Sequence, residues 1–333
     1  MPVAPPPVAD ALLAVDDLTV EFPTRRGTLT AVRGVSFAIA AGEVLGLVGE
    51  SGAGKSVTGA AVIGLIDPPG RIASGRIVLD GRRIDDLPSA AMRRVRGREI
   101  GAVFQDPLTA LDPLYSIGRQ LVETIRAHLD LTEGQARERA LSLLADVGIP
   151  APASRFDQYP HQFSGGMRQR VVIALALAAA PRLIIADEPT TALDVSIQAQ
   201  IIALLARLAR EHRTAILLIT HDMGVIAEIA SRVAVMYAGR IVEIGDVDDV
   251  SHRPRHPYTA GLMGSIPSVR MKRDRLLQID GSMPRLTALP RGCAFHPRCP
   301  RARAACESVD PALARLGAGQ VACHWPLDVG VTA

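Results

Sequence analysis

Three short apolar runs along the chain each end at polar residues that can carry chemistry. The run VLGLV precedes a glycine-rich turn, LIIA ends at two carboxylates, and AILLIT ends at His221 and Asp222. Continuous apolar runs separated by helical stretches predict a parallel sheet covered on both faces. Open α/β sheets bind their ligands at the carboxyl ends of such strands. We therefore expect an α/β fold with its functional residues at the ends of these runs.

The pattern becomes helical between about Pro107 and Pro160. Ile117, Leu121, Ile125 and Leu129 recur at a spacing of four residues, and Thr132 with Gln135 has the form of a capping box. This predicts a helical insert over about residues 107–170. After about Val247 the proline and arginine content rises and long apolar runs stop. We expect a flexible N-terminus over 1–11, a main domain over 12–246, and a smaller C-terminal domain over 247–333.

Composition limits the class of protein. The 333 residues are 48% hydrophobic and 21% charged, which is typical of a globular protein, and the net charge of +3 does not indicate nucleic acid as a partner. No apolar run reaches the ~18–20 residues that span a bilayer, and the start of the chain does not resemble a secretory signal. We expect the chain in the cytosol, with any membrane contact made through another protein.

The glycine-rich turn has the sequence GESGAGKS, which fits the phosphate-binding pattern G-x-x-x-x-G-K-[ST] between a strand and a helix. Its backbone N–H groups would surround phosphates, Lys55 would reach the β- and γ-phosphates, and Ser56 would ligate Mg²⁺. The alternative is a glycine-rich turn that binds no nucleotide. The predicted nucleotide-binding residues are Gly49, Glu50, Ser51, Gly52, Ala53, Gly54, Lys55 and Ser56.

Two further motifs fit the same chemistry. Asp187 ends an apolar strand and could hold Mg²⁺, and Glu188 follows it directly, where it could polarise an attacking water. Two ordinary surface carboxylates are the alternative. In the stretch FSGGMRQR, Ser164 is placed to cap a helix that two bare glycines open, which suits an anion. Alone, that signal also fits a routine helix cap.

The order and spacing of these motifs resemble those of the ATP-binding cassette (ABC) ATPases, over about Leu12 to Gly245. The resemblance implies a P-loop core of the RecA-like type with an antiparallel β subdomain and a helical insert, followed here by a small irregular C-terminal domain. It implies ATP and Mg²⁺ as cofactors. It also implies that two cassettes dimerise head to tail, with ATP between the P-loop of one and the signature motif of the other.

The resemblance also implies roles for individual residues. Phe22 would stack on adenine, Asp194 would lie in the D-loop across the dimer interface, and His221 would contact the γ-phosphate. Phe22 could instead be a core aromatic, and His221 a structural histidine. Gln105 would join Ser56 and Asp187 around Mg²⁺ and couple to the membrane subunit. The residues expected to contact the partner's ATP are Ser164, Gly165, Gly166 and Met167, the last of which is glutamine in many cassettes.

Two stretches narrow the choice among cassette proteins. FQDPLTALDPL and the segment around His256, Pro257 and Tyr258 resemble importer ATPases for oligopeptides, dipeptides and nickel, in particular the D-type subunit, although asparagine is usual where Asp112 stands. This implies a type I importer with a second, paralogous ATPase, two transmembrane permease subunits and an extracytoplasmic binding protein. The chain would lie at the cytoplasmic face of the inner membrane. A nickel or metal-chelate cargo is the alternative, and a DNA-maintenance or translation ATPase is the alternative from another class.

All four cysteines fall near the C-terminus, with spacing C-x5-C-x6-C-x16-C. This spacing has no C-x-x-C pair, which weakens a zinc-ribbon interpretation, and a cytosolic location disfavours disulfides. Four thiolates suit an iron–sulfur cluster, and the resemblance implies a [4Fe–4S] cluster on Cys293, Cys299, Cys306 and Cys323. Zinc and no metal remain alternatives, with His296 and His324 as substitute ligands.

Overall fold

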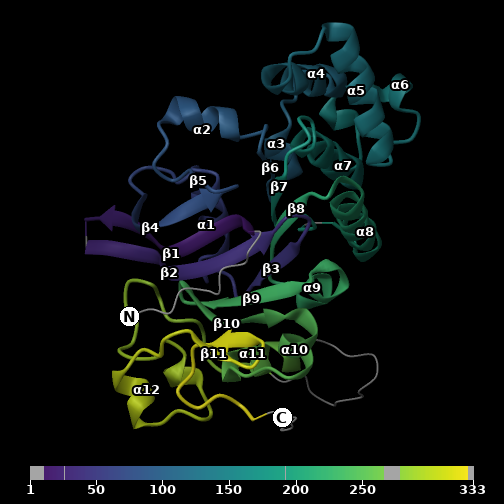
Figure 1. Ribbon diagram of the computed structural model, residues 1–333. Coiled ribbons are helices and arrows are strands. Elements are labelled where there is room, and N and C mark those ends of the chain that lie inside the picture. The colour runs from purple at the N-terminus through teal and green to yellow at the C-terminus, as the bar shows by residue number, and fades with distance from the viewer. Residues whose placement is uncertain (1–10, 26, 192, 266–277, 329–333) are drawn as a thin grey trace. The chain divides into compact units, whose positions relative to one another are not determined.

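The computed structural model describes residues 11–25, 27–191, 193–265 and 278–328. Its contacts divide the chain into two compact units (Figure 1). The first comprises residues 1–40, 44–85 and 219–333, and the second comprises 41–43 and 86–218. The flexible N-terminus expected over 1–11 lies outside the described residues except for residue 11. Among the helices of the described ranges, none is both long and apolar enough to cross a membrane.

One sheet of the first unit is antiparallel, with strand order β2-β1-β4-β5. Its strands are β1 (Ala11–Thr24), β2 (Gly27–Ala40), β4 (Arg71–Leu79) and β5 (Arg82–Arg83). In β2 the alternate residues Val35, Phe37 and Ile39 are buried, because successive side chains of a strand point to opposite faces. This sheet is the antiparallel β subdomain that the resemblance to ABC ATPases implied.

A second set of strands in the first unit leads into the glycine-rich turn. Its order is β11-β12-β10-β9-β3, in which β3 and β9 are parallel and β9, β10, β12 and β11 pair antiparallel. Every residue of β3 is buried, as expected for the run VLGLV. The strands are β3 (Val44–Val48), β9 (Arg232–Tyr237), β10 (Arg240–Asp246), β11 (Ala314–Leu316) and β12 (Gly319–Val321).

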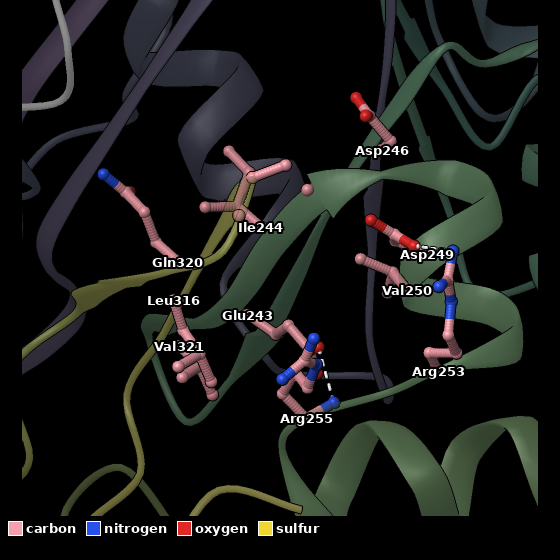
Figure 2. Close-up of a pocket in the computed structure, with 13 residues that line it drawn as sticks. Glu243, Ile244, Asp246, Asp249, Val250, Arg253, Arg255, Leu316, Gln320 and Val321 are labelled. Atoms are coloured by element: carbon pink, nitrogen blue, oxygen red, sulfur yellow. Dashed lines mark hydrogen bonds and ion pairs between the residues drawn. The ribbon is translucent and has the colours of Figure 1, made fainter. Parts of the chain in front are cut away.

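The C-terminal extension belongs to the same compact unit as these strands. The expected boundary near Asp246 falls where β10 gives way to a helix, but β12 returns and pairs with β10, so that Glu243 lies opposite Val321 (Figure 2). The helices of this unit are α1 (Lys55–Val62), α9 (Met223–Ile229), α10 (Val247–His252), α11 (Pro257–Gly264), the 3₁₀ turn η2 (His296–Arg298) and α12 (Ala304–Ser308).

The second unit contains three strands, in the order β8-β7-β6, and most of the helices. The strands are β6 (Ile100–Val103), β7 (Leu183–Asp187) and β8 (Ala215–Thr220), whose first four residues belong to this unit. The strands β6 and β7 are parallel. The helices are α2 (Ser89–Val95), α3 (Pro107–Ala110), α4 (Ile117–His128), α5 (Glu133–Asp146), α6 (Pro152–Arg155), the 3₁₀ turn η1 (Pro160–Gln162), α7 (Gly165–Ala176) and α8 (Val195–His212).

The helical insert follows its sequence pattern closely. Ile117, Leu121 and Ile125 of α4 are buried on one face. The capping box predicted at the start of α5 is present, because the Gln135 backbone N–H donates to Thr132 Oγ1 while Gln135 Oε1 accepts from the Thr132 backbone N–H at 3.0 Å. The capping box and the buried face of α4 are therefore confirmed, but the helix α4 ends at His128, so Leu129 is a half-buried C-cap residue outside the helix.

Candidate nucleotide-binding site

The glycine-rich turn connects β3 to α1 in the first unit. Gly54 precedes α1 with a φ of 103°, and a Cβ atom at this position would lie 2.7 Å from the Ala31 carbonyl oxygen. Only glycine fits both the left-handed backbone and this close approach. The turn therefore exposes bare backbone at the start of α1, where helix N–H groups attract an anion.

Lys55 is the first residue of α1 and is only 5% exposed. Its ammonium donates to the carbonyl oxygens of Gly49 at 2.8 Å and Glu50 at 3.1 Å. These carbonyl groups replace the water that a buried charge loses. The lysine charge is thus held within the turn itself, where the oxygens of a polyphosphate could take over from the carbonyl groups.

Two other predicted ATP contacts also lie in the first unit. Phe22 near the end of β1 is half-buried, and its ring lies directly against the backbone of Gly70, since a Cβ on Gly70 would come within 2.5 Å of the Phe22 Cε1 atom. His221 follows β8 and is exposed. The next residue, Asp222, caps α9 by accepting from the Gly224 N–H at 2.7 Å.

Three side chains meet at the carboxyl ends of β6 and β7 in the second unit. Gln105 Nε2 donates to Glu188 Oε2 at 3.1 Å, and Thr191 Oγ1 donates to the same oxygen at 2.8 Å. Glu188 also has a left-handed backbone with φ of 45°, a conformation that costs energy in a non-glycine residue and is frequent at functional sites. Asp187, at the end of β7, is half-buried. Gln105 and Glu188 are therefore hydrogen-bonded, because they follow neighbouring parallel strands. Thr191 also bonds to Glu188, and no motif in the sequence indicated this residue.

The predicted signature and D-loop residues lie beside each other in the second unit. Ser164 caps α7 by accepting from the Met167 N–H at 3.4 Å, and Asp194 caps α8 by accepting from the Ile197 N–H at 3.0 Å. The Ile197 N–H bond, with a second bond from Ser196, lowers the pKa of Asp194. A Cβ on Gly166 would lie 2.7 Å from Ile197 Cγ2, so the two helix starts are in contact.

The four cysteines line one cavity in the C-terminal extension, together with His256, His296, His324 and Trp325. They form no disulfide. Burial, with smaller contributions from neighbouring cysteines, raises the pKa of the Cys293 thiol to about 11 and also raises the pKa values of Cys299 and Cys323. Over the described ranges, no three or more His, Cys, Asp or Glu side chains are arranged to hold a metal ion.

Comparison with known proteins identifies the family. Residues 32–191 match the ABC transporter family, and residues 242–306 match the oligopeptide/dipeptide transporter C-terminal region. The dipeptide transport ATP-binding protein DppD of Escherichia coli is 47% identical over 319 residues, which cover 96% of this chain and 98% of DppD. The oligopeptide transport ATP-binding protein OppD of Bacillus subtilis is 52% identical over 286 residues, or 85% of this chain and 80% of OppD. The chain belongs to the ABC transporter family.

Solved structures agree with this assignment. The ATP-binding cassette MJ0796, in a dimeric post-hydrolysis state bound to ADP and Pi, is similar with a TM-score of 0.64 and 27% identity, covering 71% of this chain and 98% of that one. CbiO1 from Clostridium perfringens is similar with a TM-score of 0.62 and 30% identity, covering 72% and 90%. The predicted fold class and family are therefore confirmed, and the chain is the ATP-hydrolysing subunit of an ABC importer.

Proposed function

We propose that this chain hydrolyses ATP to drive the import of dipeptides or oligopeptides through partner permease subunits. The observation that carries the proposal is the convergence of Gln105 and Thr191 on Glu188 beside Asp187, at the end of a buried strand. Support for the cargo comes from the C-terminal region matched by peptide transporters and from relatives that cover nearly the whole chain. A binding protein outside the membrane and a position at the cytoplasmic face follow from the same proposal.

In this proposal each motif acts through its own chemistry. The Gly49–Ser56 turn offers backbone N–H groups and the Lys55 ammonium to the phosphates of ATP. Ser56, Gln105 and Asp187 are the proposed ligands of Mg²⁺, because each offers the hard oxygen that this ion prefers. The ring of Phe22 would lie against adenine, and His221 would donate to the γ-phosphate.

Glu188 is the proposed general base, which takes a proton from the attacking water. The two bonds to its Oε2 atom, from Gln105 and Thr191, fix the orientation of the carboxylate. Gln105 therefore links the base to the loop that follows β6, which is the segment expected to face the permease. Thr191 acts as a positioning residue for Glu188.

The test is the Glu188→Gln variant in the assembled transporter. The variant keeps the shape of the side chain but cannot accept the proton, so we expect ATP binding to be retained and hydrolysis to fall by roughly 100-fold or more. Lys55→Ala is the matched control, since it should lose ATP binding as well. Hydrolysis by Glu188→Gln at the wild-type rate would show that Glu188 is not the base.

We also propose that the motif from Ser164 to Met167, with Asp194, completes the ATP site of a second ATPase subunit. Support comes from the two adjacent helix starts and from the dimeric state of MJ0796, to which this chain is similar. The proposed partner is a paralogous cassette, in a complex with two permease subunits. Purification of the complex from native membranes, followed by identification of its subunits and captured ligand, tests the partners and the cargo together.

For the extension we propose a [4Fe–4S] cluster held by Cys293, Cys299, Cys306 and Cys323. Support comes from the cavity that the four cysteines share and from the four-cysteine ligation that such clusters take. Anaerobic purification should give iron and acid-labile sulfide in equal amounts. A colourless, iron-free protein that contains zinc would overturn this proposal.

A further inference from the structure

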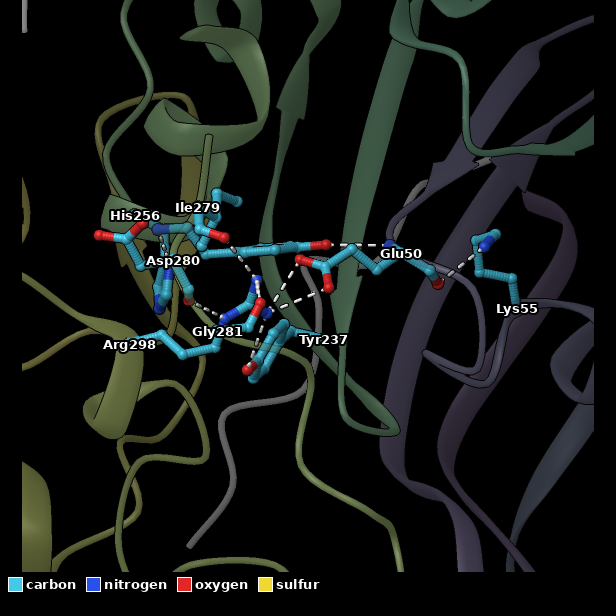
Figure 3. Close-up of polar contacts among 9 residues, drawn as sticks. Glu50, Lys55, Tyr237, His256, Ile279, Asp280, Gly281 and Arg298 are labelled. Carbon is cyan, nitrogen blue, oxygen red and sulfur yellow. Dashed lines mark hydrogen bonds and ion pairs between the residues drawn. The ribbon is translucent and has the colours of Figure 1, made fainter. Parts of the chain in front are cut away.

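The C-terminal extension reaches back to the phosphate-binding turn within the first unit. We infer that Arg298 and Tyr258, both in the extension, are positioning residues that hold Glu50 of this turn for ATP. Figure 3 shows Glu50 between Arg298 on one side and Lys55 on the other. The inference rests on the proposed function, since it takes the turn as the ATP phosphate site.

The first contact is an ion pair. Arg298 Nη1 donates to both carboxylate oxygens of Glu50, at 3.0 Å each (Figure 3). The side chain of Arg298 is 7% exposed and that of Glu50 is 29% exposed, so the pair is mostly shielded from solvent. A shielded, charge-assisted pair is stronger than a surface ion pair, which contributes little.

Arg298 is itself held in place by the extension and by Tyr237 of β9. Its Nε donates to the Asp280 carbonyl oxygen at 2.9 Å, its Nη2 to that of Ile279 at 3.3 Å, and its Nη1 also to the Tyr237 hydroxyl at 3.3 Å. These bonds fix the position of the guanidinium independently of its contact with Glu50. Arg298 ends η2 and directly precedes Cys299, so the conformation of the cysteine loop determines where the guanidinium lies.

The second contact involves the backbone of the turn. The Glu50 N–H donates to the Tyr258 hydroxyl at 2.9 Å. The Tyr258 ring is fully buried against Tyr237 and Phe295, with ring centres 4.7 and 5.4 Å away. A third contact comes from Met283, whose Cε lies 3.1 Å from the place that a Cβ on Gly52 would occupy.

Glu50 connects these contacts to the phosphate site. Its carbonyl oxygen accepts from Lys55 Nζ and from the Ala53 N–H at 3.1 Å each. A shift of Glu50 would therefore move both the lysine and the loop backbone that receives phosphate. The extension thus holds the turn in a preformed shape, which reduces the ordering cost when ATP binds.

The test measures equilibrium binding of a fluorescent ATP analogue to the full chain, together with KM and kcat for ATP in the assembled transporter. We expect Arg298→Ala to weaken ATP binding and to raise KM by about 3- to 10-fold, with a smaller change in kcat. Tyr258→Phe, which removes only the hydroxyl, should act in the same direction. A double mutant of Arg298→Ala with Glu50→Ala should lose little more than either single variant.

Two controls separate the possible explanations. Asp310→Ala removes ion pairs of the extension with Arg33 and Arg240 that do not involve Glu50, Arg298 or Tyr258, so it should leave ATP affinity unchanged. An equal loss of affinity in Asp310→Ala would mean that loosening the extension suffices, which overturns the positioning role. Unchanged affinity in both Arg298→Ala and Tyr258→Phe would also overturn it. Lys55→Ala must abolish binding, and if it does not, the proposed function fails instead.

Discussion

Gly165 and Gly166 open the same helix, but the fold needs only one of them. A Cβ on Gly166 would lie 2.7 Å from Ile197 Cγ2, whereas a Cβ on Gly165 would meet only Leu193 Cδ2 at 3.6 Å, an ordinary van der Waals distance. Packing therefore explains the second glycine and leaves the first unexplained. A ligand that approaches the bare backbone at Gly165 would explain it.

Gly165→Ala should accordingly separate stability from activity. Alanine favours the helix by up to about 1 kcal/mol over glycine, so the melting temperature should stay the same or rise. ATP hydrolysis by the assembled transporter should fall, because the added methyl group would obstruct the ATP of the partner subunit. Gly166→Ala is the contrasting variant, in which the melting temperature itself should fall. Full activity in Gly165→Ala would contradict the proposed role of the signature motif.

The burial of His256 predicts that the extension loses stability in acid. Burial lowers the pKa of His256 from 6.5 to about 3, and its Nδ1 accepts from the Tyr258 N–H at 3.0 Å. The unfolded chain binds a proton below pH 6.5 that the folded chain does not bind, so stability is lost as the pH falls from 6.5 towards 3. Between pH 7.5 and 5 this amounts to about 2 kcal/mol.

Hydrogen exchange in α11 at the two pH values measures this loss. His256→Asn should cancel most of the pH dependence, because asparagine can cap the helix in the same way without a titrating ring. An equal loss of protection in the wild type and the variant would assign the pH dependence to another group.

At the scale of elements, β10 anchors the segment that carries Tyr258. The buried carboxylate of Glu243 accepts from the Arg255 N–H at 2.7 Å (Figure 2). It also accepts from the His256 N–H at 2.9 Å. Burial raises the pKa of Glu243. The strand therefore holds the chain at the start of α11 through a side chain as well as through the pairing of β10 with β12.

Glu243→Ala should release this segment. One buried and one half-buried N–H group would lose their acceptor, which costs about 2–3 kcal/mol. The extension should then become sensitive to protease while the strands before β10 remain protected. Glu243→Gln keeps only one suitable acceptor oxygen and should give an intermediate result. If limited proteolysis cuts the wild type and Glu243→Ala at the same rate, the anchor lies elsewhere.

Local patterns and distant contacts differed in how far the sequence could predict them. The buried strand β3, the glycine-rich turn before α1 and the capping box at Thr132 depend on neighbouring residues, and all were predictable. Arg298 and Tyr258 meet Glu50 across 248 and 208 residues, so no spacing in the sequence indicated them. The three-residue strands β11 and β12 were too short to show a period, which is why the C-terminal region looked irregular.

At the scale of the whole molecule, this chain carries both motifs of a cassette ATP site, the phosphate-binding turn and the signature motif. In the proposal, the two motifs of one site come from two different subunits. Its phosphate-binding turn would serve its own ATP, while the helix start at Ser164 would serve that of the partner. In this proposal, the signature motif of a chain does not reach the ATP that is bound at the phosphate-binding turn of the same chain. Hydrolysis should therefore depend on association and not on ATP binding alone.

The purified chain should bind ATP but hydrolyse it slowly when it is monomeric. Its rate per chain should rise with protein concentration, or on addition of the proposed paralogous subunit, because in the proposal only a dimer places a signature motif against each ATP. Measurement of ATPase rate and molecular mass across a dilution series tests this expectation. Glu188→Gln in the same series shows whether any rise reflects the proposed catalytic site. A rate per chain that stays constant down to concentrations where the mass is that of a monomer would mean that one chain completes its own site.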